Sequence, residues 1–353
     1  MKHLIDLDDF SLEDIDSIIK KAIEIKTNPS KFQEKMKGKI IGTLFYEPST
    51  RTQISFQTAM LRLGGQFVGF DNPINSSVAK GENLKDTIKI ISGYTDIIAI
   101  RHPIEGAAKA ASLFSSCPII NAGDGGHLHP TQTLTDLVTL KEQKGNFENL
   151  TIGLCGDLKF GRTVHSFVKM MLKYKGNKFI FISTKELSVP EYLKNMIVKL
   201  GGEYEECSSL EKSIGNLDVL YMTRIQKERF CSGEEYDAQK DIFKLDCGKM
   251  KLARKSLVVM HPLPRVDEIE GCVDDDPRAF YFKQAANGIY ARMALILHIF
   301  SQQNCKNVSV KGQKLNMSCS NKRCITNTEK YLPKSFLKSN NEYICEYCDS
   351  RVK

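Results

Sequence analysis

Short apolar segments alternate with helical segments through about residue 300, and this alternation constrains the fold more than any other feature of the sequence. The strand-like segments form two series, at residues 40–46, 66–70, 96–100 and 118–121, and then at 151–155, 179–182, 219–222 and 257–260. Apolar strands that alternate with helices form parallel sheets covered by helices on both faces. The sequence therefore predicts two α/β domains, each with a doubly wound parallel sheet.

Helical periodicity fixes the expected domain limits. Ser11 can cap an N-terminal helix, and apolar side chains then recur on one face at Ile15, Ile18, Ile19, Ala22 and Ile23. Further helices are expected from about Thr131, over 163–173 and 190–200, and over 288–300. We expect a first domain at 1–130 with the segment 287–303 packed back on it, a second domain at 131–286, a linker at 304–317 and a small module at 318–353, with interdomain helices joining the first two.

Hydropathy and charge exclude several classes of protein. The first ten residues, MKHLIDLDDF, are acidic and lack the apolar core of a signal peptide. No apolar run approaches the ~20 residues that a membrane span needs, so we expect a cytoplasmic protein without membrane contact. Much of the net charge of +8 lies in residues 301–353, which hold eight Lys and two Arg against three Glu and one Asp. A basic tail can bind nucleic acid, but a solubilising or subunit-contacting module is the preferred interpretation.

Four of the eleven cysteines form a pattern typical of a metal site. Cys319 and Cys324 make one close pair, and Cys345 and Cys348 make the second. Two such pairs can close a tetrahedral tetrathiolate site, as in structural zinc modules. Iron in a rubredoxin-like site is the alternative. The six cysteines of the two domains are expected to be reduced thiols.

A hydroxyl-rich segment follows the first strand and starts a helix. It reads Ser49-Thr50-Arg51-Thr52. A helix N-terminus presents unpaired N–H groups and a partial positive charge, and hydroxyls with a guanidinium add donors for an anion. The segment therefore predicts a phosphate site, although an ordinary helix cap with a surface arginine would look the same.

Other candidate ligand-binding residues, polar side chains together with two backbone carbonyls, also follow strands or stand at helix starts, where ligands of α/β sheets bind. They are Ser76, Lys80, Arg101, His129, Gln132, Arg162, Arg224, Gln226, Pro262, Leu263 and Arg265. The arginines and Lys80 together call for a pair of anionic substrates, such as a phosphate and a dicarboxylate. The glycine-containing turn at 156–161 lacks the G-x-G-x-x-G spacing, so a dinucleotide site is not expected. Since no Ser or Cys nucleophile stands beside a base, catalysis by positioning and charge stabilisation is expected.

These motifs, in this order, resemble those of the aspartate carbamoyltransferases through residue 303. The resemblance implies that carbamoyl phosphate is transferred to L-aspartate, in pyrimidine biosynthesis. It implies catalytic roles for Arg51, Thr52, Arg101 and His129, and a carbamoyl-phosphate site made of Ser49, Thr50, Arg51, Thr52, Ser76, Lys80, Arg101, His129, Gln132, Pro262 and Leu263. It implies an aspartate site made of Lys80, Arg162, Arg224 and Gln226. In the family Ser76 and Lys80 come from a neighbouring subunit, so a homotrimer with shared sites is expected.

The resemblance also gives the two large domains their roles. Domain 1–130 would bind carbamoyl phosphate, and domain 131–286 would bind aspartate. Pro262 and Leu263 would offer backbone carbonyls to the carbamoyl amide. The prolines at 262 and 264 are expected to hold the segment extended. No cofactor is expected for the chemistry itself.

The cysteine-rich tail resembles the zinc domain of the aspartate carbamoyltransferase regulatory chain. It would hold one structural Zn²⁺ through Cys319, Cys324, Cys345 and Cys348. The larger nucleotide-binding domain of that regulatory chain has no counterpart here, so we expect no allosteric nucleotide site. The tail would instead brace contacts between subunits, and could join trimers into a hexamer.

Two alternative functions remain at this stage. Ornithine carbamoyltransferases share the phosphate-binding half, but they usually carry Cys where this chain has the segment His261-Pro262-Leu263-Pro264. The pair Arg162 and Arg224 favours a dicarboxylate over an amine side chain. The second alternative is a zinc-ribbon protein that binds nucleic acid and has an inactive enzyme body.

Overall fold

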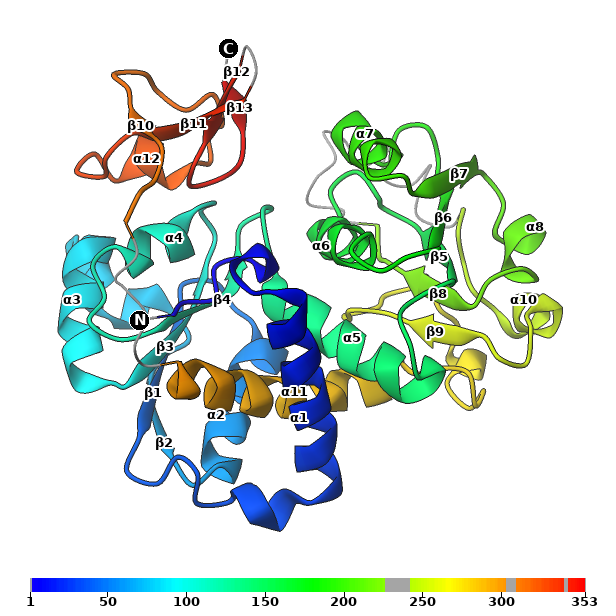
Figure 1. Cartoon of the computed structure of the whole chain (residues 1–353), viewed down its shortest axis with the longest axis horizontal. Coiled ribbons are helices and arrows are strands. Elements are labelled where there is room, and N and C mark those ends of the chain that lie inside the picture. The colour runs from blue at the N-terminus through cyan, green and yellow to red at the C-terminus, as the bar shows by residue number, and fades with distance from the viewer. Residues whose placement is uncertain (1, 226–241, 303–308, 340–341, 353) are drawn as a thin grey trace. The chain divides into compact units, whose positions relative to one another are not determined.

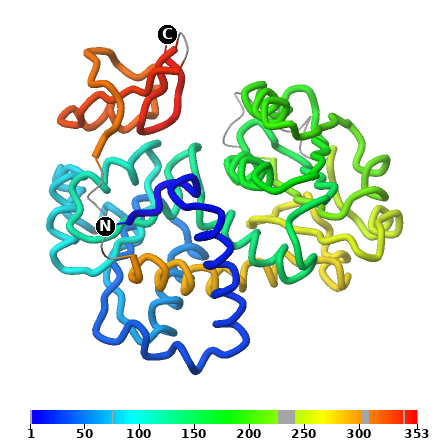
Figure 2. The backbone as a smooth tube through the Cα atoms, in the orientation of Figure 1, coloured from blue at the N-terminus to red at the C-terminus, as the bar shows by residue number. Residues whose placement is uncertain are grey.

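The computed structural model describes residues 2–225, 242–302, 309–339 and 342–352. The chain forms two compact units, the first made of Met1–Thr131 and Ile289–Lys353 and the second of Gln132–Gly288. The boundaries of the units fall inside two helices, α5 (Pro130–Lys144) and α11 (Tyr281–Ser301). In Figure 2, α11 is the orange helix that precedes the C-terminal module in the chain. Each unit is described separately below.

The first unit is built on a parallel sheet of four strands in the order β2-β1-β3-β4. The strands are β1 (Ile40–Phe45), β2 (Gln66–Phe70), β3 (Ile97–His102) and β4 (Ile119–Asp124). The helices between and before them are α1 (Leu12–Thr27), α2 (Thr50–Arg62), α3 (Leu84–Tyr94) and α4 (Ala107–Ser112), with short 3-10 turns at Leu7–Asp9, Pro29–Phe32, Pro73–Asn75 and Ser77–Lys80. The predicted parallel sheet is confirmed.

Helix α1 shows how the local sequence specifies an element. The Ser11 hydroxyl accepts the N–H of Asp14, and the Asp14 carboxylate accepts the N–H of Ser11, which closes a capping box. The buried face holds Ile15, Ile18, Ile19, Ala22 and Ile25, so Ile25 lies in the core where the sequence analysis had placed Ile23. The C-terminal part of α11 contacts this helix, since His298 Nε2 lies 3.3 Å from a carboxylate oxygen of Asp14.

The second unit contains a parallel sheet of five strands in the order β7-β6-β5-β8-β9. Its strands are β5 (Thr151–Cys155), β6 (Lys178–Ile182), β7 (Glu203–Cys207), β8 (Val219–Met222) and β9 (Val258–Met260). Its helices are α6 (Arg162–Met171), α7 (Glu191–Lys199), α8 (Leu210–Ile214) and α10 (Cys247–Leu252), with a 3-10 turn at Gly271–Val273. Strand β7 was not predicted, because this edge strand reads EYEEC and lacks an apolar run.

A small antiparallel sheet forms the C-terminal module, within the first unit. Its strands are β10 (Gln313–Lys314), β11 (Ser335–Ser339), β12 (Glu342–Cys345) and β13 (Arg351–Val352), with one short helix α12 (Ile325–Thr328). The module shares a hydrophobic core with α4 of its own chain. The core residues from α4 are Ala107, Ala108, Ala110 and Ala111, and those from the module include Ile325, Leu332, Phe336 and Tyr347.

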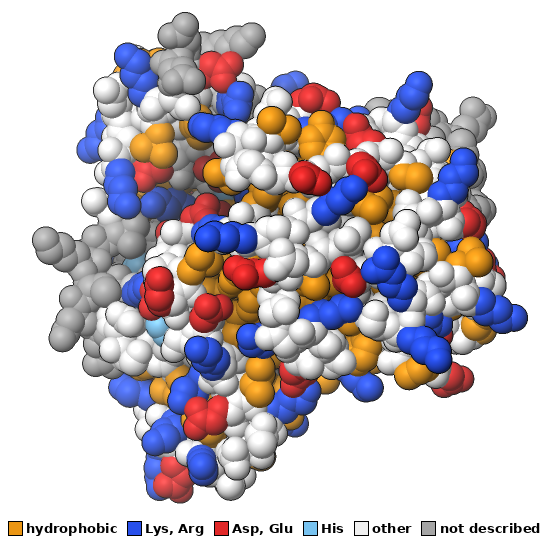
Figure 3. All heavy atoms as spheres, turned by 45° about the vertical axis from the view of Figure 1, so that its right-hand side comes forward, with side chains coloured by type: hydrophobic (Ala, Val, Ile, Leu, Met, Phe, Trp, Pro, Cys, Tyr) orange, Lys and Arg blue, Asp and Glu red, His pale blue; other side chains and the backbone are white. Residues whose placement is uncertain are grey.

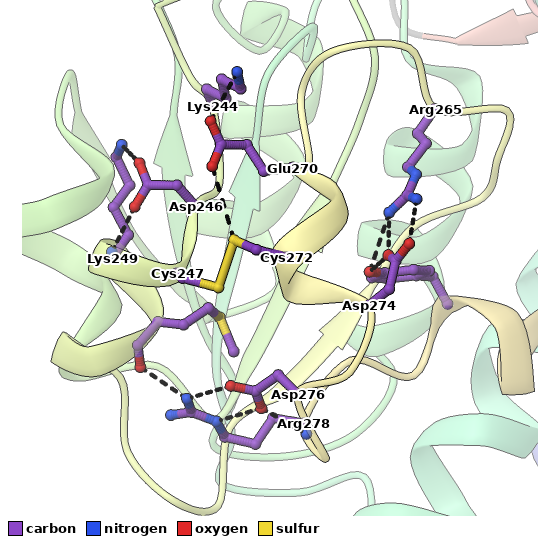
Figure 4. Close-up of a disulfide and its surroundings, with 12 residues drawn as sticks. Lys244, Asp246, Cys247, Lys249, Arg265, Glu270, Cys272, Asp274, Asp276 and Arg278 are labelled. Atoms are coloured by element: carbon purple, nitrogen blue, oxygen red, sulfur yellow. Dashed lines mark hydrogen bonds and ion pairs between the residues drawn. A yellow bond between two sulfur atoms is a disulfide. The ribbon is translucent and has the colours of Figure 1, made fainter.

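One expectation about the cysteines is wrong. Cys247, at the start of α10, and Cys272, in the 3-10 turn, form a disulfide with a Cα–Cα distance of 6.1 Å, as Figure 4 shows. That distance lies within the normal range for a disulfide. The two cysteines lie 25 positions apart in the sequence, so neither the composition nor the local pattern could reveal the pair.

The surface carries mixed charge, and no described helix could cross a membrane. Figure 3 shows Lys and Arg side chains interspersed with Asp and Glu over the visible face. Within the described ranges, every helix is too short or too polar to span a bilayer.

Candidate active site

The predicted phosphate segment lies at the start of α2, directly after β1. Ser49 occupies the N-cap position with extended φ of −157°, but its side chain makes no capping hydrogen bond. Thr52 is buried, and Thr50 and Arg51 stand in the first turn on the exposed side. The hydroxyl of Ser49 thus does not satisfy the helix's own N–H groups, which is the arrangement that an anion site requires.

Two arginines of the first unit, Arg51 and Arg101, are close enough to interact electrostatically. Partial desolvation, with the nearby Arg101 charge, lowers the pKa of Arg51. Arg101 stands near the end of β3, where the β3–β4 register shifts between Ile100 and His102. Its Nη2 lies 2.7 Å from an oxygen of Glu47, just before the phosphate segment. Glu47 therefore holds the guanidinium of Arg101 close to the segment 49–52.

Gly123 brings Arg101 and His129 into the same neighbourhood. Its φ is +125°, a conformation that favours glycine. A Cβ at this position would lie 3.4 Å from Nη1 of Arg101 and 3.7 Å from Cδ2 of His129. His129 itself is buried. The structure therefore joins two of the predicted catalytic side chains at the carboxyl ends of β3 and β4.

The predicted residues Ser76 and Lys80 occupy a separate exposed segment. The Ser76 hydroxyl donates to the Pro73 carbonyl at 2.7 Å and accepts the N–H of Val78 at 3.3 Å. Lys80 ends the following 3-10 turn and is exposed. These contacts are local and do not connect Ser76 to the segment 49–52.

The second unit holds two of the predicted aspartate residues, Arg162 and Arg224, at the carboxyl ends of two adjacent strands. Arg162 begins α6, after β5, and Arg224 follows β8, which pairs directly with β5. Both side chains are partly exposed. Gln226 lies outside the described residues. Two guanidinium groups at neighbouring strand ends suit a ligand with two carboxylates.

The segment after β9 carries the predicted carbonyl ligands Pro262 and Leu263. The expectation of an extended backbone is wrong at Leu263, whose φ is +52°. Nδ1 of His261 accepts the Leu263 N–H at 2.7 Å, and Nε2 of His261 lies 2.8 Å from Glu268. This left-handed conformation is uncommon for leucine and marks a turn that tertiary contacts impose.

Arg265, which also follows a strand, pairs with a carboxylate of the second unit. Figure 4 shows its guanidinium paired with both carboxylate oxygens of Asp274. This pairing raises the pKa of Arg265. The guanidinium also lies 5.5 Å from the ring centre of Phe282. Arg265 is therefore held by contacts within the second unit.

Sequence reasoning also missed several buried polar residues around the site. Asp136 lies four residues after Gln132 on α5, and its carboxylate accepts the Gln132 side-chain N–H at 2.7 Å. This i,i+4 spacing was a readable signal. Tyr221 and Gln284, which also contact Asp136, are too distant in sequence to be recognised.

The four predicted metal ligands come together in the C-terminal module. Their sulfur atoms all lie within 4.8 Å of one another, and all four cysteines are buried. The sulfur atoms of Cys319 and Cys348 are 3.6 Å apart, and those of Cys324 and Cys345 are 3.7 Å apart. A tetrahedral site with metal–sulfur bonds of about 2.3 Å needs sulfur atoms about 3.8 Å apart. The four thiols are therefore close enough together to hold one structural metal.

Three family models match the chain. Residues 2–142 match the aspartate/ornithine carbamoyltransferase carbamoyl-P binding domain, and residues 148–299 match the Asp/Orn binding domain of the same family. Residues 310–353 match the metal binding domain of the aspartate carbamoyltransferase regulatory chain. The first two models together cover most of the chain.

Individual relatives and solved structures point to the same family as the family models. The aspartate carbamoyltransferase catalytic subunit of Clostridium perfringens is 58% identical over 302 residues, which span 85% of this chain and 98% of that one. The catalytic subunit of M. jannaschii aspartate transcarbamoylase is 46% identical, with a TM-score of 0.81 over 86% of this chain and 100% of that one. The Trypanosoma cruzi aspartate transcarbamoylase in complex with carbamoyl phosphate and aspartate is 36% identical, with a TM-score of 0.78 over 84% of this chain and 95% of that one.

These similarities favour aspartate carbamoyltransferase over both alternatives considered from the sequence. Among the relatives named above, all are aspartate carbamoyltransferases, and none is an ornithine enzyme or a nucleic-acid-binding protein. The chain belongs to the aspartate carbamoyltransferase family and carries, at its C-terminal end, a metal-binding domain of the kind found in the regulatory chain.

Proposed function

We propose that this chain transfers the carbamoyl group of carbamoyl phosphate to the α-amine of L-aspartate, with the site residues predicted from its sequence. The products are N-carbamoyl-L-aspartate, an intermediate for pyrimidine biosynthesis, and phosphate. The observation that carries the assignment is the grouping of Arg51 with Arg101 in one unit, and the placement of Arg162 and Arg224 on adjacent strand ends in the other. These two cationic groups match a phosphate and a dicarboxylate.

The phosphate group binds at the start of α2. Ser49, Thr50 and Thr52 donate hydroxyl hydrogen bonds, and Arg51 pairs with the phosphate oxygens. The helix N-terminus adds N–H groups and a partial positive charge. Arg51 also stabilises the negative charge that grows on the phosphate as it departs.

The carbamoyl group lies between donors and acceptors of different residues. Thr52, Arg101 and His129 donate to the carbonyl oxygen and stabilise the oxyanion of the tetrahedral intermediate. The carbamoyl nitrogen donates to Gln132 and to the backbone carbonyls of Pro262 and Leu263. On binding, Arg101 exchanges part of its interaction with Glu47 for the substrate.

Aspartate binds to the second cationic group. Arg162 and Arg224 pair with its carboxylates, with Gln226 beside the second arginine and Lys80 reaching in from a neighbouring subunit. This arrangement leaves the α-amine unpaired and directed at the carbamoyl carbon.

The reaction needs no cofactor in this scheme. The neutral α-amine attacks the carbamoyl carbon, which forms the new C–N bond and an oxyanion. The intermediate collapses, the C–O bond to the phosphate breaks, and the phosphate leaves with the bonding electron pair. The proton lost by the amine passes to the released phosphate or to water. Rate enhancement comes from positioning and from charge stabilisation.

A phosphate-release assay tests this function directly. With carbamoyl phosphate present, we expect phosphate release that depends on aspartate and yields carbamoyl aspartate. Replacing aspartate by ornithine is the matched control, and we expect no release above background. Turnover with ornithine and none with aspartate would contradict the assignment.

We propose that the active unit is a homotrimer in which each site is shared. Exposed apolar side chains lie on α2 and on the edge strand β2, including Ile54, Leu61, Phe67 and Val68, and an exposed edge of this kind favours subunit contact. Mixing the separately inactive variants Arg51→Ala and Lys80→Ala tests the sharing. After reassembly of an equal mixture, at most about a quarter of the sites should combine an intact Arg51 from one chain with an intact Lys80 from its neighbour. The mixture should therefore regain up to that fraction of the activity of the unaltered protein. No regain of activity would contradict shared sites.

We propose zinc as the metal of the C-terminal module, with Cys319, Cys324, Cys345 and Cys348 as its four ligands. A full tetrathiolate set leaves no position for substrate, so the metal is structural. Elemental analysis of purified protein should give one zinc atom per chain, whereas one iron atom would contradict the choice of metal.

We also propose that the module pairs trimers into a hexamer, and that the protein is cytoplasmic. Light scattering on the whole chain and on a chain without residues 313–353 tests the assembly. Halving of the mass on deletion supports pairing through the module, and an unchanged mass contradicts it. The functional division into a carbamoyl-phosphate domain at 1–130 and an aspartate domain at 131–286 belongs to the same proposal.

A further inference from the structure

A buried carboxylate organises a hydrogen-bond network inside the second unit. Asp136 lies on α5 and is fully buried. Its Oδ1 accepts the side-chain N–H of Gln132 at 2.7 Å and that of Gln284 at 2.6 Å, and its Oδ2 accepts the Tyr221 hydroxyl at 3.0 Å. A carboxylate is costly to bury, and several donors of this kind are what make it tolerable.

Gln284 extends this network to the segment after β9. Its Nε2 donates to Asp136, and its Oε1 accepts the backbone N–H of His261 at 2.9 Å. Because a carboxylate only accepts and a backbone N–H only donates, the amide of Gln284 has one possible orientation. His261 then accepts the Leu263 N–H at 2.7 Å through Nδ1. Three consecutive hydrogen bonds therefore connect Asp136 to Leu263.

The same reasoning fixes the orientation of Gln132. Its Nε2 is the end that faces Asp136, because the carboxylate can only accept. Its Oε1 is consequently the opposite end of the amide. Without Asp136 the amide of Gln132 could rotate by half a turn and present a donor at the same place.

We propose that Asp136 and Gln284 are positioning residues that make the site selective for the amine of the carbamoyl group. They hold three acceptors: Oε1 of Gln132 and the backbone carbonyls of Pro262 and Leu263. This inference rests on the proposed function, in which these three groups receive the carbamoyl NH₂. It adds two residues that do not touch the substrate but determine which acyl phosphate fits.

Selectivity follows from the cost of unpaired acceptors. Acetyl phosphate has nearly the shape of carbamoyl phosphate, but a methyl group replaces the amine. A site that offers fixed acceptors rejects such an analogue because its polar groups then lose their partners. If the acceptors can rotate or shift, the site's preference for carbamoyl phosphate over acetyl phosphate becomes smaller.

Two variants test the proposal. Asp136→Ala removes the acceptor for both amides, and Gln284→Met removes the connection to His261 at similar side-chain length. For each we expect kcat/KM for carbamoyl phosphate to fall by about 30-fold, since hydrogen bonds that orient the substrate are lost. The inhibition constant of acetyl phosphate should change by less than about threefold, because it never used these acceptors.

Two further variants serve as controls. Asp136→Asn keeps an oxygen that both amides can bond, while its NH₂ group can donate to the Tyr221 hydroxyl, so selectivity should return to near the original value. Tyr221→Phe removes one donor to Asp136 without touching Gln132 or His261, and should leave selectivity unchanged. Thermal unfolding of every variant identifies any that does not fold, and Gln284→Met decides the matter if Asp136→Ala is such a variant.

The proposal would be overturned if the variants bound acetyl phosphate more weakly by the same factor by which kcat/KM for carbamoyl phosphate falls. That result would show a purely structural role for Asp136 and Gln284. Full selectivity in Asp136→Ala or Gln284→Met would overturn it as well. Failure of the proposed function looks different: the unaltered chain would then show no aspartate-dependent phosphate release from carbamoyl phosphate.

Discussion

At the scale of single residues, the site depends on charges held in place by opposite charges or by backbone geometry. Glu47 holds Arg101 at 2.7 Å, and Gly123 admits Arg101 and His129 to one region because it has no side chain. Arg51 differs from these, since it stands in the first turn of α2 where the helix end already favours an anion. Substituting Arg51 should therefore affect the chemistry far more than the fold.

We predict that Arg51→Ala lowers kcat by at least about 100-fold, as expected when a group that stabilises transition-state charge is removed. The matched control is Arg62→Ala, which removes a guanidinium from the last turn of the same helix, where it contacts the Tyr290 hydroxyl at 3.4 Å. The control should keep its activity, and both variants should melt cooperatively. Normal turnover in Arg51→Ala would refute the assigned role.

A second residue-scale prediction concerns pH. Burial lowers the pKa of His102 to about 4, against the opposing charge of Asp124, and burial lowers the pKa of His3 to about 4 as well. In the unfolded chain each histidine binds a proton near pH 6.5. Between pH 6.5 and 4 the unfolded state therefore holds more protons, so the free energy of unfolding falls as pH falls.

The expected loss between pH 7 and pH 5 is about 2 kcal/mol per buried histidine. Urea unfolding at the two pH values measures it. His102→Asn keeps an acceptor for the Ile104 N–H, which now bonds Nδ1 at 3.1 Å, but does not titrate in this range. The variant should show a smaller pH dependence whatever its absolute stability, and an undiminished dependence would contradict the assignment to His102.

At the scale of elements, the C-terminal module completes a helix of the first unit. Asn83 caps α3 by accepting the N–H of Asp86. The other two early N–H groups are satisfied by the module: Leu84 donates to Glu329 at 3.3 Å, and Lys85 donates to the Tyr331 hydroxyl at 2.9 Å. Helix ends need such partners. The module therefore helps to cap α3, the helix that follows the Ser76–Lys80 segment.

We predict that Tyr331→Phe lowers the free energy of unfolding by about 1 kcal/mol, because the Lys85 N–H loses its acceptor. Tyr343→Phe in β12 is the matched control, since its hydroxyl is not part of this contact. Chemical unfolding measures both variants. Equal stability of the two variants would show that the module does not contribute to the cap.

At the scale of the whole molecule, the module is part of the first unit and packs on its own chain. The Glu105 N–H donates to the Arg323 carbonyl at 3.1 Å, and the Ile325 N–H donates to the Glu105 carbonyl at 2.9 Å. A Cβ at Gly106 would lie 2.7 Å from Cβ of Tyr347, so this close approach requires glycine. His127 connects Asp124 of β4 to Asp349 of the module, at 3.2 and 3.0 Å.

The four clustered cysteines, which are the proposed metal ligands, belong to the core that the module shares with α4. Loss of the proposed metal should therefore destabilise more than the module. We predict that Cys345→Ser, or removal of the metal by a chelator, lowers the melting temperature of the entire first unit and exposes α4 to proteolysis. Cys207→Ser in the second unit is the matched control. An unchanged melting temperature in Cys345→Ser would contradict the shared core.

The sequence by itself determined the features that depend on neighbouring residues. Apolar periodicity predicted eight of the parallel strands, and the spacing of Cys319, Cys324, Cys345 and Cys348 predicted that these four cysteines form a cluster. Strand-end motifs singled out Arg51, Arg101, Arg162 and Arg224 as site candidates. These signals are local, because strand and helix periods and ligand spacings are set by the backbone itself.

Only the tertiary structure decided which distant residues meet. Arg265 had the same local signal as Arg162, yet it pairs with Asp274. Asp136 meets Gln284 across 148 positions, and Cys247 meets Cys272 across 25. The physical reason is that a buried polar group must find partners wherever packing brings them, and a pattern read along the chain carries no record of that packing.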